Sequence, residues 1–308
     1  MAVIEYEGTD ISAQVAVSRC VWDAREEGRV PRLSLRFDDA QGLWDSWAAK
    51  PGDRIAVAAE GAAATGTMYV KRISPIAGGY EIEADALPVP DTPAVREWRQ
   101  TTFKVVAGEL AAVLGLRAVF HGCEDMPFAY VRQDAQGVLP VLAKLCMLAG
   151  CTFDVYEGTA HVCARDWAAS QESTGVLEVA ASSEYEYRMQ RPYTLCTINQ
   201  TAIAGTRAGI VASYGEAGFE LAAKLDETIG MLGSSGLNRA CAGMLACANA
   251  RRSGGYVKSD SLSPYSPGSV CTVECAKAPS LSGLAIVTRV RNDFWSKTSK
   301  TWWRCIDG

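Results

Sequence analysis

Alternating apolar and polar residues run through the first third of the chain and predict β-strands. The clearest case is residues 32–37, where Leu33, Leu35 and Phe37 fall on one side and polar residues fall on the other. A period of two places one face of a strand against a core and the other face in solvent. Several short strands of this kind up to about residue 90 indicate a barrel or a sandwich.

The same strand cassette occurs twice, about 216 residues apart. One copy begins at Pro51 and the other at Pro267, and each Pro-Gly pair leads into three predicted strands. These strands are residues 54–57, 66–73 and 80–85 in the first copy and residues 270–273, 283–290 and 302–307 in the second. Two similar β modules per chain double the number of equivalent surfaces in a closed ring, which is a property of a scaffold.

A helical period replaces the period of two in the middle of the chain. Apolar residues recur every three or four positions over residues 103–114, where Thr102 can cap the helix, and again over residues 137–149. Glu157-Gly158 then separates two strand-like segments and predicts a two-residue type I′ hairpin. The middle of the chain is therefore expected to hold two helices and a hairpin.

The last part of the chain returns to strands and contains one more predicted helix. This helix covers about residues 237–253, with Asn238 as its cap and Gly254-Gly255 as its end. The segment Gly233–Gly236 before it is Gly/Ser-rich and is interpreted as a linker.

These patterns predict an α+β fold that is mainly β. Two similar β-barrel modules flank an inserted helix–helix–hairpin domain, and the prolines at 88, 90 and 93 mark the first boundary. The predicted domains are residues 1–90, the first β-barrel module; residues 94–168, the α/β domain; and residues 175–308, the second β-barrel module with one helix.

Composition and charge narrow the function. The 308 residues are 48% hydrophobic and 21% charged, which is ordinary for a folded soluble protein. A net charge of −5 disfavours a groove that holds a nucleic-acid backbone, although an acidic channel that DNA slides through remains open. The longest apolar stretch, residues 138–151, is too short to cross a bilayer, and the N-terminus does not resemble a signal peptide. The expected compartment is the cytoplasm.

The cysteines and histidines offer little chemistry. The 11 cysteines cannot all pair, none lies in a C-x-x-C pair, and they are interpreted as free thiols in the core. His121-Gly122-Cys123 and His161-Val162-Cys163 are the only zinc candidates, and neither has the usual ligand spacing. We therefore expect no metal and no cofactor.

No catalytic constellation is evident either. A Ser–His–Asp arrangement would need His121, interpreted as a loop residue, or His161, interpreted as a half-buried strand residue. Glu81, Glu83 and Asp85 share one strand face, which indicates a solvated face or the wall of a pore. The chain is therefore predicted not to be an enzyme, with no catalytic site residues.

Tryptophans suggest a different kind of site. Trp302 and Trp303 are adjacent on one predicted strand and must point to opposite faces, so one needs cover that a neighbouring subunit could supply. Trp44 and Trp47 precede the first cassette. Core packing and an interface anchor are both open for these residues.

Taken in order, the segments resemble the hub proteins of phage tails, the phage late control D family. The residues that carry the resemblance are Leu33-Ser34-Leu35 and Pro51-Gly52-Asp53; Trp98, Thr101-Thr102-Phe103 and Leu114-Gly115-Leu116; Leu142-Ala143, Gly150 and Arg165; and Asn238-Arg239-Ala240, Pro267-Gly268-Ser269-Val270 and Val287-Thr288-Arg289-Val290. Unlike longer members, the chain carries no spike repeat or lysozyme-like segment, so the puncturing tip is expected to be a separate protein.

The resemblance implies a homotrimeric hub in which two β-barrels per subunit form a ring that joins a hexameric tail tube to a trimeric spike. It also implies assembly in the bacterial host cytoplasm, a final place in the virion tail baseplate, and contacts with other baseplate and tape-measure proteins. Three alternatives remain open: a tail-tip carbohydrate-binding adhesin, a tail-associated cell-wall hydrolase, and the same hub in a secretion or bacteriocin-like particle. Neither specific nucleic-acid binding nor membrane insertion is expected.

Overall fold

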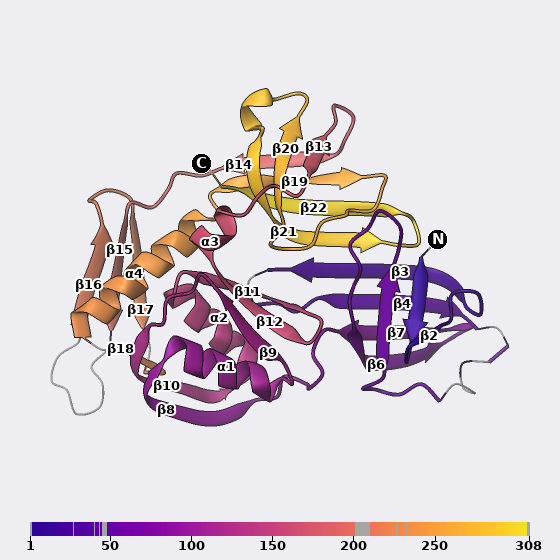
Figure 1. Cartoon of the computed structure of the whole chain (residues 1–308), viewed down its shortest axis with the longest axis horizontal. Helices are drawn as coiled ribbons and strands as arrows, with labels where there is room; N and C mark the ends of the chain where they lie inside the picture. Colours follow the sequence, from indigo (N-terminus) through magenta and orange to yellow (C-terminus); the bar gives the residue numbers. More distant parts are fainter. Residues whose placement is uncertain are drawn as a thin grey trace.

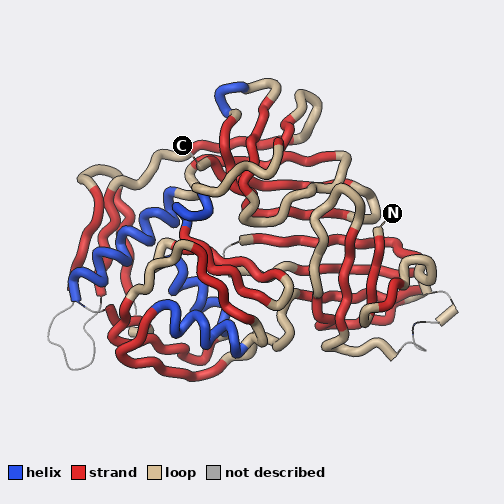
Figure 2. The backbone as a smooth tube through the Cα atoms, in the orientation of Figure 1, coloured by secondary structure: helices blue, strands red, loops and turns tan. Residues whose placement is uncertain are grey.

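A computed structural model describes residues 2–26, 28–39, 41–42, 44, 48–200, 210–225, 227–231 and 233–306. Strands hold 49% of the described residues and helices 17%, which confirms the predicted mainly β, α+β fold. Figure 2 shows the helices gathered around the middle part of the chain, while both cassettes are drawn almost wholly as strands and loops. No helix among the described residues is long and apolar enough to cross a membrane.

One 13-stranded sheet carries both cassettes (Figure 1). Its strands are β1 (Val3–Tyr6), β2 (Thr9–Asp10), β3 (Ala16–Arg25), β4 (Arg32–Asp38), β5 (Arg54–Ala58), β6 (Met68–Ile76), β7 (Gly79–Asp85), β13 (Val176–Val179), β14 (Tyr185–Met189), β19 (Ser253–Ser259), β20 (Val270–Cys275), β21 (Gly283–Asp293) and β22 (Thr298–Cys305). The main path is β14-β19-β22-β21-β3-β4-β7-β6-β5-β1-β2, and β20 and β13 branch from β21.

The two cassettes are built alike. The order β3-β4-β7-β6-β5-β1 in the first half matches β14-β19-β22-β21-β20-β13 in the second, strand for strand along the chain. Both contain a bulge at the same place, after Val70 in β6 and after Val287 in β21. The Pro-Gly turns also match, because Gly52 N–H donates to the Val70 carbonyl and Gly268 N–H donates to the Val287 carbonyl, each at 2.8 Å. The predicted internal repeat is therefore present in the structure.

The sequence suggested that the two modules are separate sheets. In the structure they form one sheet, because β3 of the first module pairs with β21 of the second. Five residue pairs connect these strands, from Arg289 opposite Arg25 to Asp293 opposite Val21. The Asp23 carboxylate accepts hydrogen bonds from Arg289 across this seam at 2.9 and 2.5 Å. Pairing between residues some 270 positions apart leaves no local pattern, so the sequence could not reveal it.

The part of the chain between the modules in sequence forms three helices and contributes most strands of two small sheets. Its elements are β8 (Ala94–Thr102), α1 (Phe103–Val113), β9 (Arg117–His121), β10 (Pro127–Gln136), α2 (Val138–Leu148), β11 (Cys151–Tyr156), β12 (Thr159–Ala164) and α3 (Arg165–Ala169). Glu157 and Gly158 have φ values of 46° and 66°, as a type I′ turn requires, which confirms the predicted hairpin.

The helix starts differ from the prediction in what caps them. Thr102 occupies the N-cap position of α1, but its side chain makes no cap hydrogen bond. Asp125 instead accepts from the backbone N–H of Lys104 at 3.0 Å. At α2, the carboxylate of Asp91 accepts from Val138 N–H at 2.5 Å and from Leu139 N–H at 3.2 Å. Carboxylates that are distant in the sequence therefore cap both helices, where residues next to the helix start were expected to do so.

The last helix was predicted wrongly at both ends. The remaining elements are β15 (Leu195–Gln200), β16 (Ile210–Gly215), β17 (Glu220–Leu225), β18 (Ile229–Met231), α4 (Gly233–Asn249) and a short 3-10 helix at Pro279–Leu281. The supposed linker Gly233–Gly236 is the first turn of α4, and Asn238 lies inside the helix. Gly254 and Gly255 belong to β19. Residues 201–209 lie outside the described residues, as does Asp307, the last residue of the predicted strand 302–307.

Candidate assembly interface

Among the described residues, the open strand edges of the large sheet include two that are longer than the short end strands β2 and β13. β14 ends the sheet and pairs only with β19. β6 pairs with β5 only through Met68 and Tyr69, so residues 71–76 have β7 on one side and no strand on the other. These edges lie toward opposite ends of the sheet (Figure 1). Unpaired strand edges are templates for pairing with another chain.

The internal repeat makes the two open edges complementary. β6 is the counterpart of β21, and β14 is the counterpart of β3, yet β21 and β3 pair with each other inside the chain. The second half of β21, after its bulge, makes this seam, and the matching second half of β6 is the part left open. The two open edges are therefore the repeat counterparts of the two strands that form the closed seam.

The repeat also matches single residues of the open edges to residues of the seam. The match is found by following directly opposite residues from strand to strand across each module. From Arg72 the residues directly opposite are, in turn, Glu83, Ser34 and Val21. From Arg289 they are, in turn, Trp302, Tyr256 and Glu186. Glu186 thus matches Val21, and three residues further along Met189 matches Ala24. Val290 lies opposite Ala24 in the seam. If β6 and β14 of two copies paired in the same way, Ile73 would lie opposite Met189.

Backbone hydrogen bonds show which residues of β14 face outward. Gln190 N–H donates to the Arg252 carbonyl at 2.7 Å, and the Glu184 carbonyl accepts from Lys258 at 2.9 Å, so even-numbered residues face β19. The N–H and C=O groups of Tyr185, Tyr187 and Met189 therefore point away from the sheet, because neighbouring residues of a strand alternate. They match the residues of β3 that bond β21.

Side-chain exposure agrees with an interface at these edges. Met189 is 71% exposed, the largest value among the exposed large hydrophobic residues that the structure describes, and Ile73 is half-buried. Their counterparts at the closed seam, Ala24 and Val290, are fully buried. Pro75 also faces outward on β6 and has no N–H, so the pairing would have one hydrogen bond fewer than the seam.

Charges at the closed seam and at the open edges differ. Burial acts to raise the pKa of Asp23, but hydrogen bonds and charge from Arg289 and Arg25 outweigh it and hold this pKa below its ordinary value. At the open edges the positions of Arg289 and Asp23 are taken by Arg72 and Arg188. Arg72 binds Glu83 of its own module at 2.6 Å.

The acidic row of β7 is neutralised by neighbouring strands. Glu83 pairs with Arg72, Asp85 pairs with Lys71 at 3.2 Å, and Glu81 lies opposite Arg36 in the sheet register. The row is therefore part of a face of mixed charge rather than an acidic wall. This arrangement fits the predicted solvated face.

The tryptophans find cover within their own chain. Trp303 is buried, and the guanidinium of Arg289 lies 4.2 Å above the ring of Trp302. The expected cover from a neighbouring subunit is thus not needed at Trp302. Trp44 is buried against Phe37, with ring centroids 4.6 Å apart, and Trp47 lies outside the described residues.

The two zinc candidates come together without forming a metal site. His121 is the last residue of β9, not a loop residue, and its Nε2 lies 3.2 Å from Nδ1 of His161. The His121 ring also stacks on Trp167 at 4.7 Å. Among the described residues no group of three or more His, Cys, Asp or Glu side chains could hold a metal ion. Burial, followed by charge from His121 and Arg117, lowers the pKa of His161, which is half-buried as expected.

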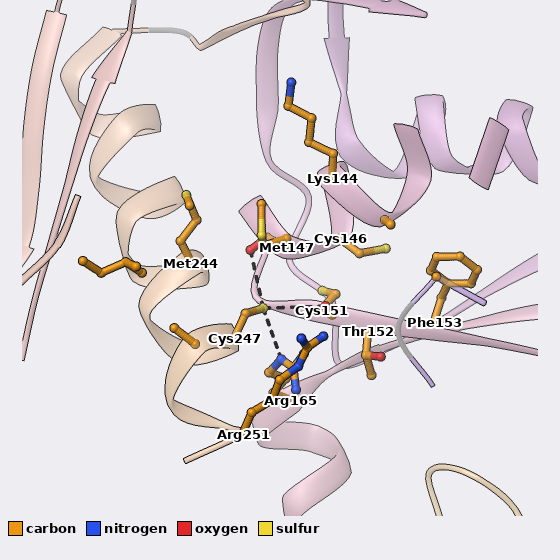
Figure 3. A pocket seen from close by; sticks show the side chains of 14 residues that line it. Lys144, Cys146, Met147, Cys151, Thr152, Phe153, Arg165, Met244, Cys247 and Arg251 are labelled. Atoms are coloured by element: carbon orange, nitrogen blue, oxygen red, sulfur yellow. Dashed lines mark hydrogen bonds between the residues drawn. The ribbon is translucent and has the colours of Figure 1, made fainter. Parts of the chain in front are cut away.

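A cavity of about 430 Å³ lies between α2, α4 and β11 (Figure 3). Its lining is mostly apolar and includes Cys146, Cys151 and Cys247, with Arg165 donating from Nε to the Cys247 sulfur at 3.1 Å. Its walls come from segments that are distant in the sequence, so no local pattern predicts this cavity. It offers no nucleophile–base pair among the described residues that would suggest catalysis.

Comparison with solved structures places the fold. The chain matches a tail protein from Neisseria meningitidis MC58 with a TM-score of 0.71 and 12% identity, over 100% of this chain and 96% of that one. It matches the 43 kDa tail protein of prophage MuSo2 from Shewanella oneidensis with a TM-score of 0.67 and 13% identity, over 99% and 98% of the two chains. No protein-family model matches the sequence, and no curated protein does.

A third similar structure comes from a secretion system. It is an Escherichia coli component of the type VI secretion system that is itself structurally similar to the phage T4 tail proteins gp27 and gp5. The TM-score is 0.56 with 13% identity, over 97% of this chain and 76% of that one. The chain therefore has a fold found in phage tail proteins and in a component of this secretion machine. The chain has two β modules that are joined by a closed seam, and each module keeps an open strand edge.

Proposed function

We propose that this protein is the structural hub of a phage or phage-derived tail. Three copies form a ring in which β6 of each copy pairs with β14 of the next. Each copy contributes two modules, so the ring has threefold symmetry and six similar faces. One side matches a hexameric tail tube and seeds its assembly, and the other side holds a trimeric spike.

The observation that carries the proposal is that the two strands of the closed seam have unpaired counterparts at the open edges. The contact between β3 and β21 shows how two modules of this chain fit together, and the open β14 and β6 edges are the same two surfaces left unpaired. A heterologous contact repeated with a constant rotation closes into a ring when the rotation allows it. Six modules in three chains would place all seams in equivalent positions.

The proposed partners and place follow from this role. The hub would contact the tail tube protein, the spike and other baseplate and tape-measure proteins, and would lie in the virion tail after assembly in the host cytoplasm. The mixed charge of the exposed sheet face supports a surface without specific affinity for nucleic acid. The proposed division at residues 1–90, 94–168 and 175–308 describes two tube-facing modules and an inserted α/β domain.

Cross-linking tests the ring directly. Ile73→Cys combined with Met189→Cys places one new thiol on each open edge, and a short bismaleimide should join them between copies. Because each chain carries both edges, denaturing gels should show a ladder that stops at three chains. The matched control combines Ile73→Cys with Val211→Cys, which places the second thiol at an equally exposed site (62%) on β16, and should remain monomeric on the gel.

The ladder distinguishes the possible assemblies. A ladder that ends at two chains would mean a closed dimer, and one that continues past three would mean an open filament. Either result, or monomers only, would contradict the trimeric ring. Native mass measurement of the unmodified protein should give three chains.

The residues that the sequence offered for the two competing functions do not support them. A carbohydrate-binding adhesin would need an open aromatic platform, but Arg289 covers the Trp302 ring. A cell-wall hydrolase would need convergent catalytic groups, and the only histidines are paired with each other in a half-buried position. The non-enzymatic role therefore stays a prediction, and a zymogram on purified cell wall should show no clearing.

A further inference from the structure

Two thiols of the α/β domain lie close enough to be joined. Cys123 follows β9 and Cys151 opens β11, and their sulfur atoms are 3.5 Å apart. A disulfide needs about 2.0 Å, so a shift of roughly 1.5 Å, within the reach of a χ1 adjustment, would bring them into bonding distance. Cys196 and Cys241 also interact, but both belong to the sheet and helix of the later part of the chain.

We propose that Cys123 and Cys151 form an intrachain disulfide when the protein meets a hydroperoxide. The Cys123 sulfur attacks the peroxide, which is reduced to water, and becomes a sulfenic acid. The Cys151 sulfur then displaces the sulfenic hydroxyl, the S–S bond forms and a second water leaves. The protein loses two hydrogen atoms in total, and the peroxide supplies both oxidising equivalents.

The surroundings of the pair assign these roles. The Cys151 thiol donates a hydrogen bond to the Cys123 sulfur, and this bond, which outweighs the opposing effect of burial, lowers the pKa of Cys123. The same contact and burial raise the pKa of Cys151. The thiolate is the reactive form, so Cys123 is the residue oxidised and Cys151 the residue that resolves it.

A small oxidant can approach from two sides. Cys151 lines the cavity of about 430 Å³ between α2 and α4, where Figure 3 shows it beside Cys146 and Cys247. On the other side, Gly122 and Glu124, which flank Cys123, line a second cavity of about 330 Å³. Cys123 itself is almost fully buried and lines neither cavity, so the small molecule hydrogen peroxide is the oxidant chosen for the test.

The bond would fix a segment that already braces two helices. Asp125 caps α1 through Lys104 N–H, and the Met126 carbonyl accepts from Phe103 N–H at 2.8 Å. Glu124 binds Arg239 of α4 at 2.6 Å. Linking Cys123 to Cys151, just beyond the end of α2, would tie three helices together at one point. Closing a loop of this length restricts the unfolded chain and so stabilises the fold.

The experiment uses the full chain. Protein reduced and desalted is treated with a small excess of hydrogen peroxide, alkylated in denaturant, digested and mapped by mass spectrometry. We expect a mass loss of about 2 Da, a cross-linked peptide pair containing Cys123 and Cys151, nine alkylated cysteines, and a higher thermal midpoint than the reduced protein.

Variants separate this pair from the other thiols. Cys123→Ala should abolish the cross-link and the midpoint shift, while Cys163→Ala, a half-buried thiol on neighbouring β12, should keep both. Eleven alkylated cysteines after peroxide, or a bond between a different pair, would overturn the proposal. Mapping of the unmutated protein decides the matter even if a variant fails to fold. The result does not depend on the proposed ring, since the bond lies within one chain.

Discussion

At the scale of single residues, Asp154 is the group most at odds with its surroundings. It lies on β11 opposite His161, its Oδ1 is inaccessible, and no hydrogen-bond partner reaches that atom. Burial raises its pKa to about 7, with a smaller contribution from Glu26 and an opposing one from Val155 N–H. A carboxyl with this pKa keeps its proton in mildly acidic solution and loses it as pH rises through about 7.

The sign of the resulting pH dependence is fixed by that shift. The pKa in the folded protein lies above 3.8, the ordinary value of an aspartate, so the contribution to stability is full below about pH 4 and falls as pH rises toward 7. Asp154→Asn keeps the shape and removes the titration. We expect the thermal midpoint of the variant, relative to the unmutated protein, to rise by a few degrees between pH 5 and pH 8.

Calorimetry at several pH values checks this prediction. His161 acts in the opposite direction, because its lowered pKa means that stability is lost as pH falls below about 6.5, the ordinary histidine value. Since both proteins retain His161, the difference between their midpoints isolates Asp154. A difference that stays constant with pH would contradict the assignment.

At the scale of elements, the start of α1 allows a comparison between a residue next to the helix and a distant residue as the cap. Thr102 is at the N-cap, but its Oγ1 has no partner, whereas Asp125 accepts from Lys104 N–H. Asp125→Ala should destabilise the protein by about 1 kcal/mol, the usual effect of removing a cap. Thr102→Ala should cost little, because no hydrogen bond is lost. Urea unfolding of the two variants measures the contrast, and equal losses would show that Thr102 does cap the helix.

The glycines of β19 show why this strand sits where it does. A Cβ on Gly255 would lie 2.1 Å from the Glu186 carbonyl oxygen, and one on Gly254 would lie 2.2 Å from the Trp303 carbonyl oxygen. β19 is held between β14 and β22, and only glycine allows both neighbours to approach so closely. A pair that looks like a helix end in the sequence is therefore a requirement of the sheet.

At the scale of the whole molecule, the proposed ring depends on the open edge of β14. Met189→Asp places a charge that the paired edge would bury, so association between copies should weaken by at least about tenfold. Val211→Asp, at a similarly exposed site on β16, should leave association unchanged. Native mass measurement over a range of concentrations gives the comparison, with circular dichroism to show that both variants fold. Equal behaviour of the two variants would argue against pairing through β14.

The sequence by itself determined the strand cassettes, their repetition and the hairpin at Glu157-Gly158, because each depends on residues near one another in the chain. The alternation of Leu33, Leu35 and Phe37 is preserved in β4, where all three side chains are buried. Local periodicity fixes which face of a strand is apolar, and turn residues fix where it ends.

Only the tertiary structure decided how the modules join and which edges stay open. The seam between β3 and β21 brings together residues from the two ends of the chain, and no local pattern encodes a pairing between distant segments. The same holds for the caps of α1 and α2, for the start of α4 and for the approach of Cys123 to Cys151. Ile73 and Met189 could have been suspected from the repeat, but only the observed seam gives the register in which we propose that they pair.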